Sequence, residues 1–336
     1  MAQFRQNPIT DQWVSVAPER AARPIDYLSE DGHAAKQAVC PFCAGHEDQT
    51  PREILALPSQ QQKSETACPW RVRVVENKYP FVVPRRMEES EDEQPDAMFP
   101  SREGRGVHEV VIESPQHYTR VTQLTDDELA GVLWVYRERL RQLQDSGDWS
   151  YALAFKNSGE AAGASMEHVH SQIVALPLIP ERIANICQRS ERFHRQHGHT
   201  LWADMIVKER SDGSRVVVET DRFVALCPFA PRQPYELLIA PKQAATHFTK
   251  VADDALSELA ALLHSLIARL EIAIDPLAFN WMINTGPFDT FSPEYYHWHV
   301  EIVPRVTKTA AYEWTTGLAV CSTPPEEAAR HLRQLG

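Results

Sequence analysis

The segment His168-Val169-His170-Ser171-Gln172 carries the clearest chemical signal in the sequence. Side chains two residues apart on a strand point to the same face, so we expect His168, His170 and Gln172 to share one surface. The preceding run, 157–166, is small and contains glycine, which lets backbone N–H groups approach a phosphate closely. A histidine beside such a cradle can attack phosphorus covalently, and Gln172 is a neutral donor for a phosphoryl oxygen. A pair of structural or metal-binding histidines is the alternative.

The cysteine pair Cys40 and Cys43 has the spacing of one half of a tetrahedral zinc site. A redox pair would require a helix N-terminus in a thioredoxin-like unit, and nothing near Cys40 indicates one. The sequence contains no second pair with this spacing. The remaining zinc ligands must therefore be histidines or carboxylates from elsewhere in the chain.

A second motif, His297-Trp298-His299-Val300-Glu301, has the same alternation but carries Glu where the first motif has Gln. A carboxylate is a poor neighbour for a phosphate, so this copy is predicted to be degenerate or metal-binding. His247, His297 and His299 are candidates for a second metal site. Histidines that only support the scaffold are the alternative.

Each of the two histidine motifs stands at the end of a longer stretch, and the two stretches contain the same predicted elements in the same order. A helix is predicted to begin near Asp126, because Thr125 and Glu128 form a capping box and the apolar residues that follow have helical spacing. Asp126 and Asp253 lie 127 residues apart, and so do Asn157 and Asn284. The sequence therefore predicts an α+β fold with an internal duplication, each unit an antiparallel sheet packed with helices. We place the boundary after residue 180, giving domains 1–180 and 181–336; two unrelated α+β segments are the alternative.

The composition is that of a soluble globular protein, with 43% hydrophobic and 24% charged residues in a chain of 336. Lys and Arg number 34 and Asp and Glu 46, a net charge of −12, which argues against nucleic-acid binding through counterion release. Any anionic substrate then needs a local cationic site. No apolar run is long enough for a membrane span, and neither a signal peptide nor a disulfide framework is evident. We expect a cytoplasmic protein with no nucleic-acid or membrane partner.

Further short motifs occur in a recognisable order, namely 7–13, 17–24, 40–43, 76–77, 114–117 and 168–172. Together they resemble the galactose-1-phosphate uridylyltransferases, the transferase branch of the histidine-triad superfamily. The resemblance runs from about residue 5 to the C-terminus. It implies two tandem histidine-triad-like units in one chain, usually paired into a homodimer.

The resemblance also implies roles for individual residues. His170 would be the catalytic nucleophile and Gln172 would bond the transferred phosphoryl group. Zinc would be held structurally by Cys40, Cys43, His117 and His168; His108 competes on spacing alone, but the Ser-Pro-x-His match favours His117. Nucleoside or phosphate contacts fall on Asn77, Arg20, Arg23, Asn157 and Ser165. The two arginines would supply the local cationic clamp.

The implied reaction is a ping-pong transfer of UMP from UDP-glucose to galactose 1-phosphate through a uridylyl-histidine, a step of carbohydrate metabolism. Some features depart from those of the best-known members. Their active-site run is His-Pro-His-Gly-Gln, whereas residues 168–172 of this chain are His-Val-His-Ser-Gln. The run 163–166 and the tail 312–317 are similar to a sister branch, the plant ADP-glucose phosphorylases, and Thr285 stands where a second metal site would need histidine. An ADP-sugar phosphorylase or adenylyltransferase is therefore the alternative enzyme. A histidine-triad hydrolase and a non-catalytic, zinc-stapled nucleotide-binding protein are further alternatives.

Overall fold

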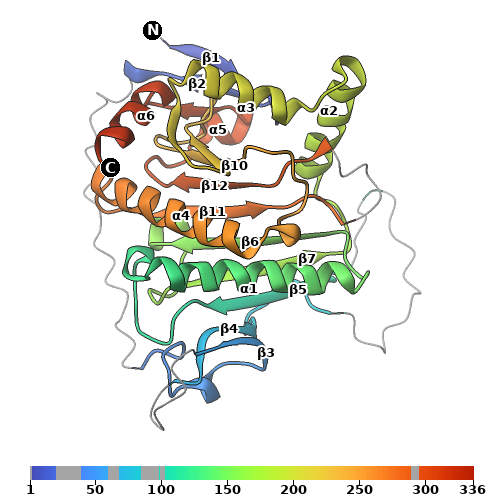
Figure 1. Cartoon of the computed structure of the whole chain (residues 1–336), viewed down its shortest axis with the longest axis vertical. Helices are drawn as coiled ribbons and strands as arrows, with labels where there is room; N and C mark the ends of the chain where they lie inside the picture. Colours follow the sequence, from blue (N-terminus) through green and yellow to red (C-terminus); the bar gives the residue numbers. More distant parts are fainter. Residues whose placement is uncertain (1, 20–38, 60–67, 85–97, 99–102, 289–294) are drawn as a thin grey trace.

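The computed structural model of the chain describes residues 2–19, 39–59, 68–84, 98, 103–288 and 295–336. Within these residues ten strands form one antiparallel sheet in the order β3-β4-β5-β7-β6-β11-β12-β10-β9-β8 (Figure 1). The strands are β3 (Glu53–Pro58), β4 (Trp70–Glu76), β5 (Val107–Ile112), β6 (Tyr151–Ser158), β7 (His170–Leu176), β8 (Val216–Glu219), β9 (Phe223–Leu226), β10 (Leu237–Pro241), β11 (Phe279–Asn284) and β12 (His299–Pro304).

The two halves of this sheet repeat one topology. In the first half β4, β5, β7 and β6 are adjacent, and in the second half β9, β10, β12 and β11 stand in the same order. Helix α1 (Asp126–Asp145) connects β5 to β6, and α4 (Asp253–Ala273) connects β10 to β11. The halves join where β6 pairs with β11, with Asn157 opposite Asn280. The predicted duplicated α+β fold is confirmed, and its two units share one continuous sheet.

Helices α1 and α4 lie side by side across one face of the sheet (Figure 1). Helix α1 begins where the capping box predicted: Thr125 Oγ1 accepts the Glu128 N–H at 3.2 Å, and the Glu128 carboxylate accepts the Thr125 N–H at 2.8 Å. Its predicted apolar stripe is buried. These side chains and those of α4 form the main core against the sheet, and burial of this apolar surface stabilises the layer.

The opposite face of the sheet is covered differently in the two units. In the second unit, α2 (Glu181–His197) and α3 (Leu201–Asp212) pack on it through apolar side chains that include Ile183 and Trp202. In the first unit, Phe42 packs there against Trp70, Val110 and Ile112. The first unit therefore keeps open space on this face beside β6 and β7, and that space contains the candidate site.

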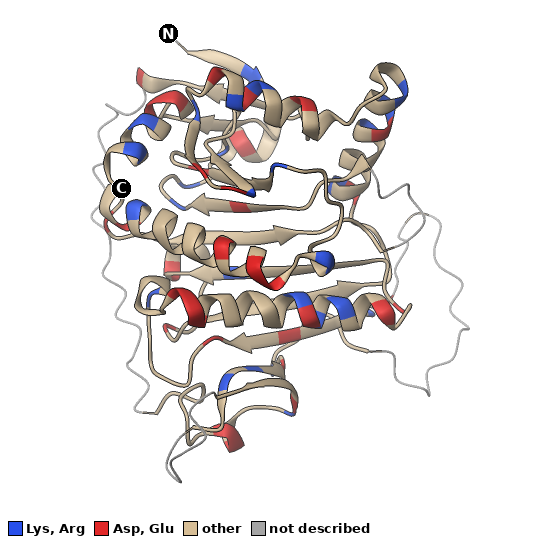
Figure 2. Ribbon diagram, in the orientation of Figure 1, with Lys and Arg blue, Asp and Glu red and all other residues tan. Residues whose placement is uncertain are grey.

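The N-terminal strands belong spatially to the second unit. Strands β1 (Gln3–Gln6) and β2 (Trp13–Val16) form a small sheet with β13 (Ala319–Cys321), near α5 (Ala311–Thr316) and α6 (Pro325–Gln334). Helix α2 begins at Glu181, and the domain boundary at residue 180 stays a prediction. The first turn of α1 is acidic, and its basic residues lie in its second half (Figure 2). No helix in the described ranges has the length and apolar character to cross a membrane.

Candidate active site

Four residues predicted as zinc ligands lie together at the edge of the first unit. The Sγ atom of Cys43 is 3.3 Å from His117 Nδ1 and 3.7 Å from His168 Nδ1, and Cys40 Sγ is 3.5 Å from His168 Nδ1. All four ligand atoms lie within 4.8 Å of one another. Tetrahedral zinc with ordinary bond lengths places its ligand atoms about 3.3–3.8 Å apart. The cluster therefore has the donors and the spacing to hold a zinc ion.

The fold orients these ligands before any metal binds. His168 Nε2 donates to the backbone oxygen of Ser114 at 2.9 Å, which leaves the Nδ1 lone pair facing the thiols. Burial lowers the pKa of His168 to about 4, so this ring is neutral at pH 7. Because the thiols come from the 40–43 loop while His117 and His168 flank β5 and β7, a bound metal would fasten that loop to the sheet.

His170 is the first residue of β7, two residues beyond a candidate zinc ligand. Its Nδ1 donates to the backbone oxygen of His168 at 2.7 Å, which leaves the Nε2 lone pair available for attack. Burial, and secondarily the nearby Lys156 ammonium, lower the pKa of His170 and keep the ring neutral. The residue borders a cavity of about 480 Å³. A neutral, oriented imidazole in this position can act as a nucleophile.

The small residues of the 157–166 run form one wall of this cavity. Asn157 and Ser165, two predicted phosphate contacts, line it together with His170. Asn157 Oδ1 accepts from Asn280 Nδ2 at 2.9 Å, so the Asn157 amide N–H groups remain as donors. Gly159 has φ +83°, and a Cβ there would come within 2.8 Å of the Ala278 side chain. Only glycine permits this turn and close approach.

Gln172 and Asn77 both lie beside His108, a residue to which the sequence analysis gave a different role. His108 Nε2 lies 2.7 Å from Gln172 Oε1 and 3.0 Å from Asn77 Nδ2. The Phe81 N–H points at His108 Nδ1 at 3.4 Å, which favours the tautomer that donates from Nε2 to Gln172. The Asn77 Nδ2 group is itself a donor, so in this tautomer it lies beside Nε2 without a hydrogen bond to it. His108 is thus not at the metal cluster, where spacing alone had made it a competitor of His117; it bonds the predicted phosphoryl contact, Gln172, and lies beside the predicted nucleoside contact, Asn77.

Other predicted and unpredicted residues complete the surroundings. Arg20 and Arg23 lie outside the described residues. A cleft of about 880 Å³ shares Asn157 with the His170 cavity. Its lining includes Trp314, which lies in the tail 312–317 that is similar to the ADP-glucose phosphorylases, and Arg305, which belongs to no motif and was missed by the sequence analysis.

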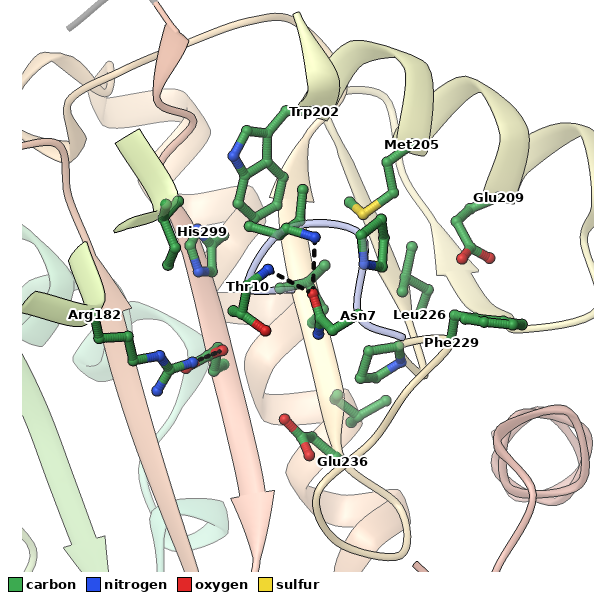
Figure 3. A pocket seen from close by; sticks show the side chains of 17 residues that line it. Asn7, Thr10, Arg182, Trp202, Met205, Glu209, Leu226, Phe229, Glu236 and His299 are labelled. Carbon is green, nitrogen blue, oxygen red and sulfur yellow. Dashed lines mark hydrogen bonds and ion pairs between the residues drawn. The ribbon is translucent and has the colours of Figure 1, made fainter. Parts of the chain in front are cut away.

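The corresponding place in the second unit is closed. His299 Nδ1 donates to His297 O at 2.9 Å, which repeats the geometry of the first unit. However, the Trp202 ring of α3 lies 4.5 Å from the His299 ring, and the space left there is about 40 Å³ (Figure 3). That this copy is degenerate or metal-binding stays a prediction.

The three histidines of the candidate second metal site are not grouped as ligands among the residues that the structure describes, and that site stays a prediction. His297 Nε2 donates to Pro241 O at 2.8 Å, and its Nδ1 accepts the Ala245 N–H at 3.4 Å. With both ring nitrogens engaged, His297 has no lone pair for a metal. Over the same described ranges, the Cys–His cluster of the first unit is the one metal-like group of three or more ligands, and His247 and His299 are not part of another.

Comparison with known proteins places the chain in a family of nucleotidyltransferases. The chain belongs to the galactose-1-phosphate uridylyltransferase family: the family's N-terminal domain matches residues 1–180. A domain of unknown function, DUF4921, matches residues 105–334.

Relatives of two activities resemble the whole chain. ADP-glucose phosphorylase of Arabidopsis thaliana is 30% identical over 99% of this chain and 93% of its own length. A solved structure of an ADP-glucose phosphorylase from Arabidopsis thaliana with bound ADP-glucose has a TM-score of 0.83 at 28% identity, covering 100% of this chain and 99% of that one. Galactose-1-phosphate uridylyltransferase of Thermotoga maritima is 27% identical over 99% of this chain and 98% of its own length. A solved uridylyltransferase structure has a TM-score of 0.75 at 27% identity, covering 100% of this chain and 98% of that one.

Proposed function

We propose that the chain transfers a nucleoside monophosphate from a nucleoside diphosphate sugar through a covalent bond to His170. One observation carries the proposal: the Nδ1–H of His170 is held by His168 O at 2.7 Å, which leaves Nε2 as the nucleophilic atom beside the cavity. Asn157 and Ser165 line the same cavity and would contact the phosphates.

The reaction divides into two displacements. In the first, His170 Nε2 attacks the α-phosphorus, a P–N bond forms, and the P–O bond to the sugar phosphate breaks to release sugar 1-phosphate. In the second, an acceptor phosphate oxygen attacks the same phosphorus, the P–N bond breaks, and His170 returns to its neutral state. Because the leaving group is already a phosphate, it needs little protonation. Most of the catalysis then comes from positioning and from donors to the non-bridging oxygens, such as Gln172.

Zinc is proposed as a structural cofactor held by Cys40, Cys43, His117 and His168. The two thiols and the Nδ1 atom of His168 have the donor set and spacing for it. When bound, the metal would fix the segment that leads into His170, and it would not activate water. The chain's own residues orient the nucleophile, since the ring of His170 is held by a backbone oxygen.

The donor we favour is ADP-glucose with inorganic phosphate as acceptor, so that the second step releases ADP. This choice rests on the relative that is 30% identical along the whole chain and on the TM-score of 0.83 to a structure with bound ADP-glucose. The sequence analysis put transfer of UMP from UDP-glucose to galactose 1-phosphate first. That reaction stays as the second candidate, because several uridylyltransferases also match most of the chain.

The test is to incubate the protein separately with ADP-glucose and UDP-glucose and to measure its intact mass. The true donor should add one nucleoside monophosphate, in an acid-labile, base-stable bond on the peptide that contains His170. Release of glucose 1-phosphate should match the adduct in amount. Sugar nucleotide binding with neither adduct nor glucose 1-phosphate would overturn the enzyme and favour a non-catalytic nucleotide-binding protein.

We also propose a homodimer, as the family resemblance implies. Trp314, at the large cleft, is 78% exposed in the single chain, and a partner subunit would cover it. Sedimentation equilibrium should give twice the chain mass. A monomer at micromolar concentration would contradict this proposal.

A further inference from the structure

A fully buried polar network lies directly beneath the proposed nucleophile, on the helix side of the sheet. Lys156 Nζ donates to Glu113 Oε2 at 2.6 Å and to the backbone oxygen of His170 at 2.9 Å. Tyr136 Oη lies 3.0 Å from Glu113 Oε1 and 2.6 Å from Ser171 Oγ. The Lys156 and Glu113 side chains are 2% and 0% exposed, so neither can contact solvent.

The network holds three successive residues around the nucleophile. Lys156 bonds His170 through its carbonyl, Tyr136 bonds Ser171 through its hydroxyl, and the Glu113 N–H donates to Val169 O at 3.2 Å. His170 Nδ1 is in turn held by the backbone of His168. A shift of the His170 peptide would therefore turn the ring relative to the cavity.

The second unit repeats the fold of the first, so its residues at the equivalent positions show which side chains the fold itself requires there. Ser171 of β7 pairs with Val111 of β5, and Val300 of β12 pairs with Ile239 of β10. Because β12 and β10 occupy the places of β7 and β5 in the repeated strand order, Val300 is the counterpart of Ser171. Phe155 pairs with Gln172 in the first unit, and Met282 pairs with Glu301 in the second, so Met282 is the counterpart of Phe155. The next residues along the two strands, Lys156 and Ile283, are therefore counterparts as well. The counterparts of all four network residues are apolar and buried: Pro241, Leu263, Ile283 and Val300.

Stability does not explain this difference. Burying two opposite charges costs desolvation that their attraction barely offsets, and apolar replacements of buried ion pairs are often neutral or stabilising. The second unit has an apolar core at the same place, and there the histidine in the nucleophile's position is covered by Trp202. The ion pair occurs only in the unit whose histidine faces an open cavity.

We propose that Lys156 is a positioning residue for the nucleophile, acting with Glu113 through the backbone of His170. This inference rests on the proposed function of His170. The pair fixes the peptide that carries the ring and thus the direction of the Nε2 lone pair. Lys156 is among the residues that line the cavity of about 480 Å³, but its ammonium is bonded to Glu113 and to the His170 carbonyl.

The test is the double variant Lys156→Met with Glu113→Leu, which removes both charges together and leaves no unpaired buried ion. The single-turnover rate of adduct formation should fall by about 10²-fold, since small misplacements of reacting groups cost about that much. The KM for the sugar nucleotide, the zinc content and the melting temperature should stay close to those of the parent. A rate within threefold of the parent would overturn the proposal.

The matched control is Ile283→Met, a comparable change at the counterpart position, which should leave the rate unchanged. If the double variant does not fold, Tyr136→Phe with Ser171→Ala provides the second test. This variant removes the hydrogen bond between Tyr136 and Ser171 and should slow adduct formation about tenfold. A change of less than twofold would contradict the network's role.

A second readout separates this inference from the proposed function. Ring ¹⁵N NMR of the parent should show His170 as one tautomer, protonated at Nδ1, and the double variant should exchange that proton at least tenfold faster. If the parent protein forms no adduct with any sugar nucleotide, the proposed function is overturned. The rate of proton exchange at His170 Nδ1 then still tests whether Lys156 and Glu113 position the ring. Unchanged exchange in the double variant overturns the positioning role.

Discussion

The imidazole of His170 donates from Nδ1 to a backbone oxygen, so its Nε2 atom is the one that can reach phosphorus. We expect His170→Gly to form no adduct and Gln172→Ala to form it roughly 10²–10³ times more slowly, as for the loss of one anion-binding donor. Single-turnover adduct formation, followed by intact mass, measures both. His299→Asn, at the covered histidine of the second unit, is the control and should react at the parent rate. An adduct in His170→Gly would show that another residue is the nucleophile.

The His108 side chain is a second prediction at the residue scale. It donates to Gln172 Oε1 at 2.7 Å, which fixes the orientation of the Gln172 amide. One hydrogen bond is worth about 1 kcal/mol, so His108→Phe should slow adduct formation about fivefold to tenfold. The same substitution in a Gln172→Ala background should have little further effect, because His108 acts through Gln172. Additive losses in the double variant would contradict this coupling.

At the scale of elements, the metal cluster connects the 40–43 loop to the ends of β5 and β7. Removing zinc with 1,10-phenanthroline should lower the melting temperature by about 5 °C or more and slow adduct formation, because the bound metal adds to folding free energy. Calorimetry before and after chelation, and after zinc is restored, checks this. A chelated protein with parent stability would mean that the cluster holds no structural metal.

The zinc-free protein should also respond to alkaline pH. Burial, and secondarily the neighbouring Cys40, raise the pKa of the Cys43 thiol to about 11 in the absence of metal. A raised pKa means that the folded state keeps the proton while the unfolded chain loses it near pH 9. The zinc-free protein should thus lose stability as the pH rises from about 9 to 11, whereas zinc-bound thiolates should not.

A carboxylate in the second unit provides the opposite pH test. Glu301 lies 3.1 Å from Arg182 and 3.3 Å from Arg232. Burial raises its pKa, but the two guanidiniums outweigh burial and lower it to about 2. The stabilisation is therefore present above the unfolded pKa of about 4.3 and is lost as the pH falls toward 2. Glu301→Gln should cost about 2 kcal/mol at pH 7, and denaturant titrations should show that difference shrinking between pH 5 and pH 2.

Much of this arrangement could be predicted from the sequence, because it depends on local patterns. The capping box at Thr125 and the alternating histidines depend on neighbours in the chain, and two copies at one offset supported each other. The contacts that could not be predicted join residues distant in the sequence. Trp202 covers His299 from a separate helix, and Lys156 meets Glu113 across the sheet. Neither contact has a sequence motif, because each depends on how the elements pack.

At the scale of the whole molecule, two similar units share one sheet, and among the described residues the nucleophile's position borders an open cavity in the first unit but not in the second. His170 borders a cavity of about 480 Å³, whereas His299 faces about 40 Å³ beneath Trp202. The number of nucleotides bound covalently should therefore saturate at one per chain, even with excess donor. Glu301→Gln restores the first unit's motif in the second unit, yet it should add no second nucleotide, because the Trp202 ring still occupies the space that a phosphate would need. Intact mass after prolonged incubation measures this, and a second increment mapped to His299 would show that α3 opens.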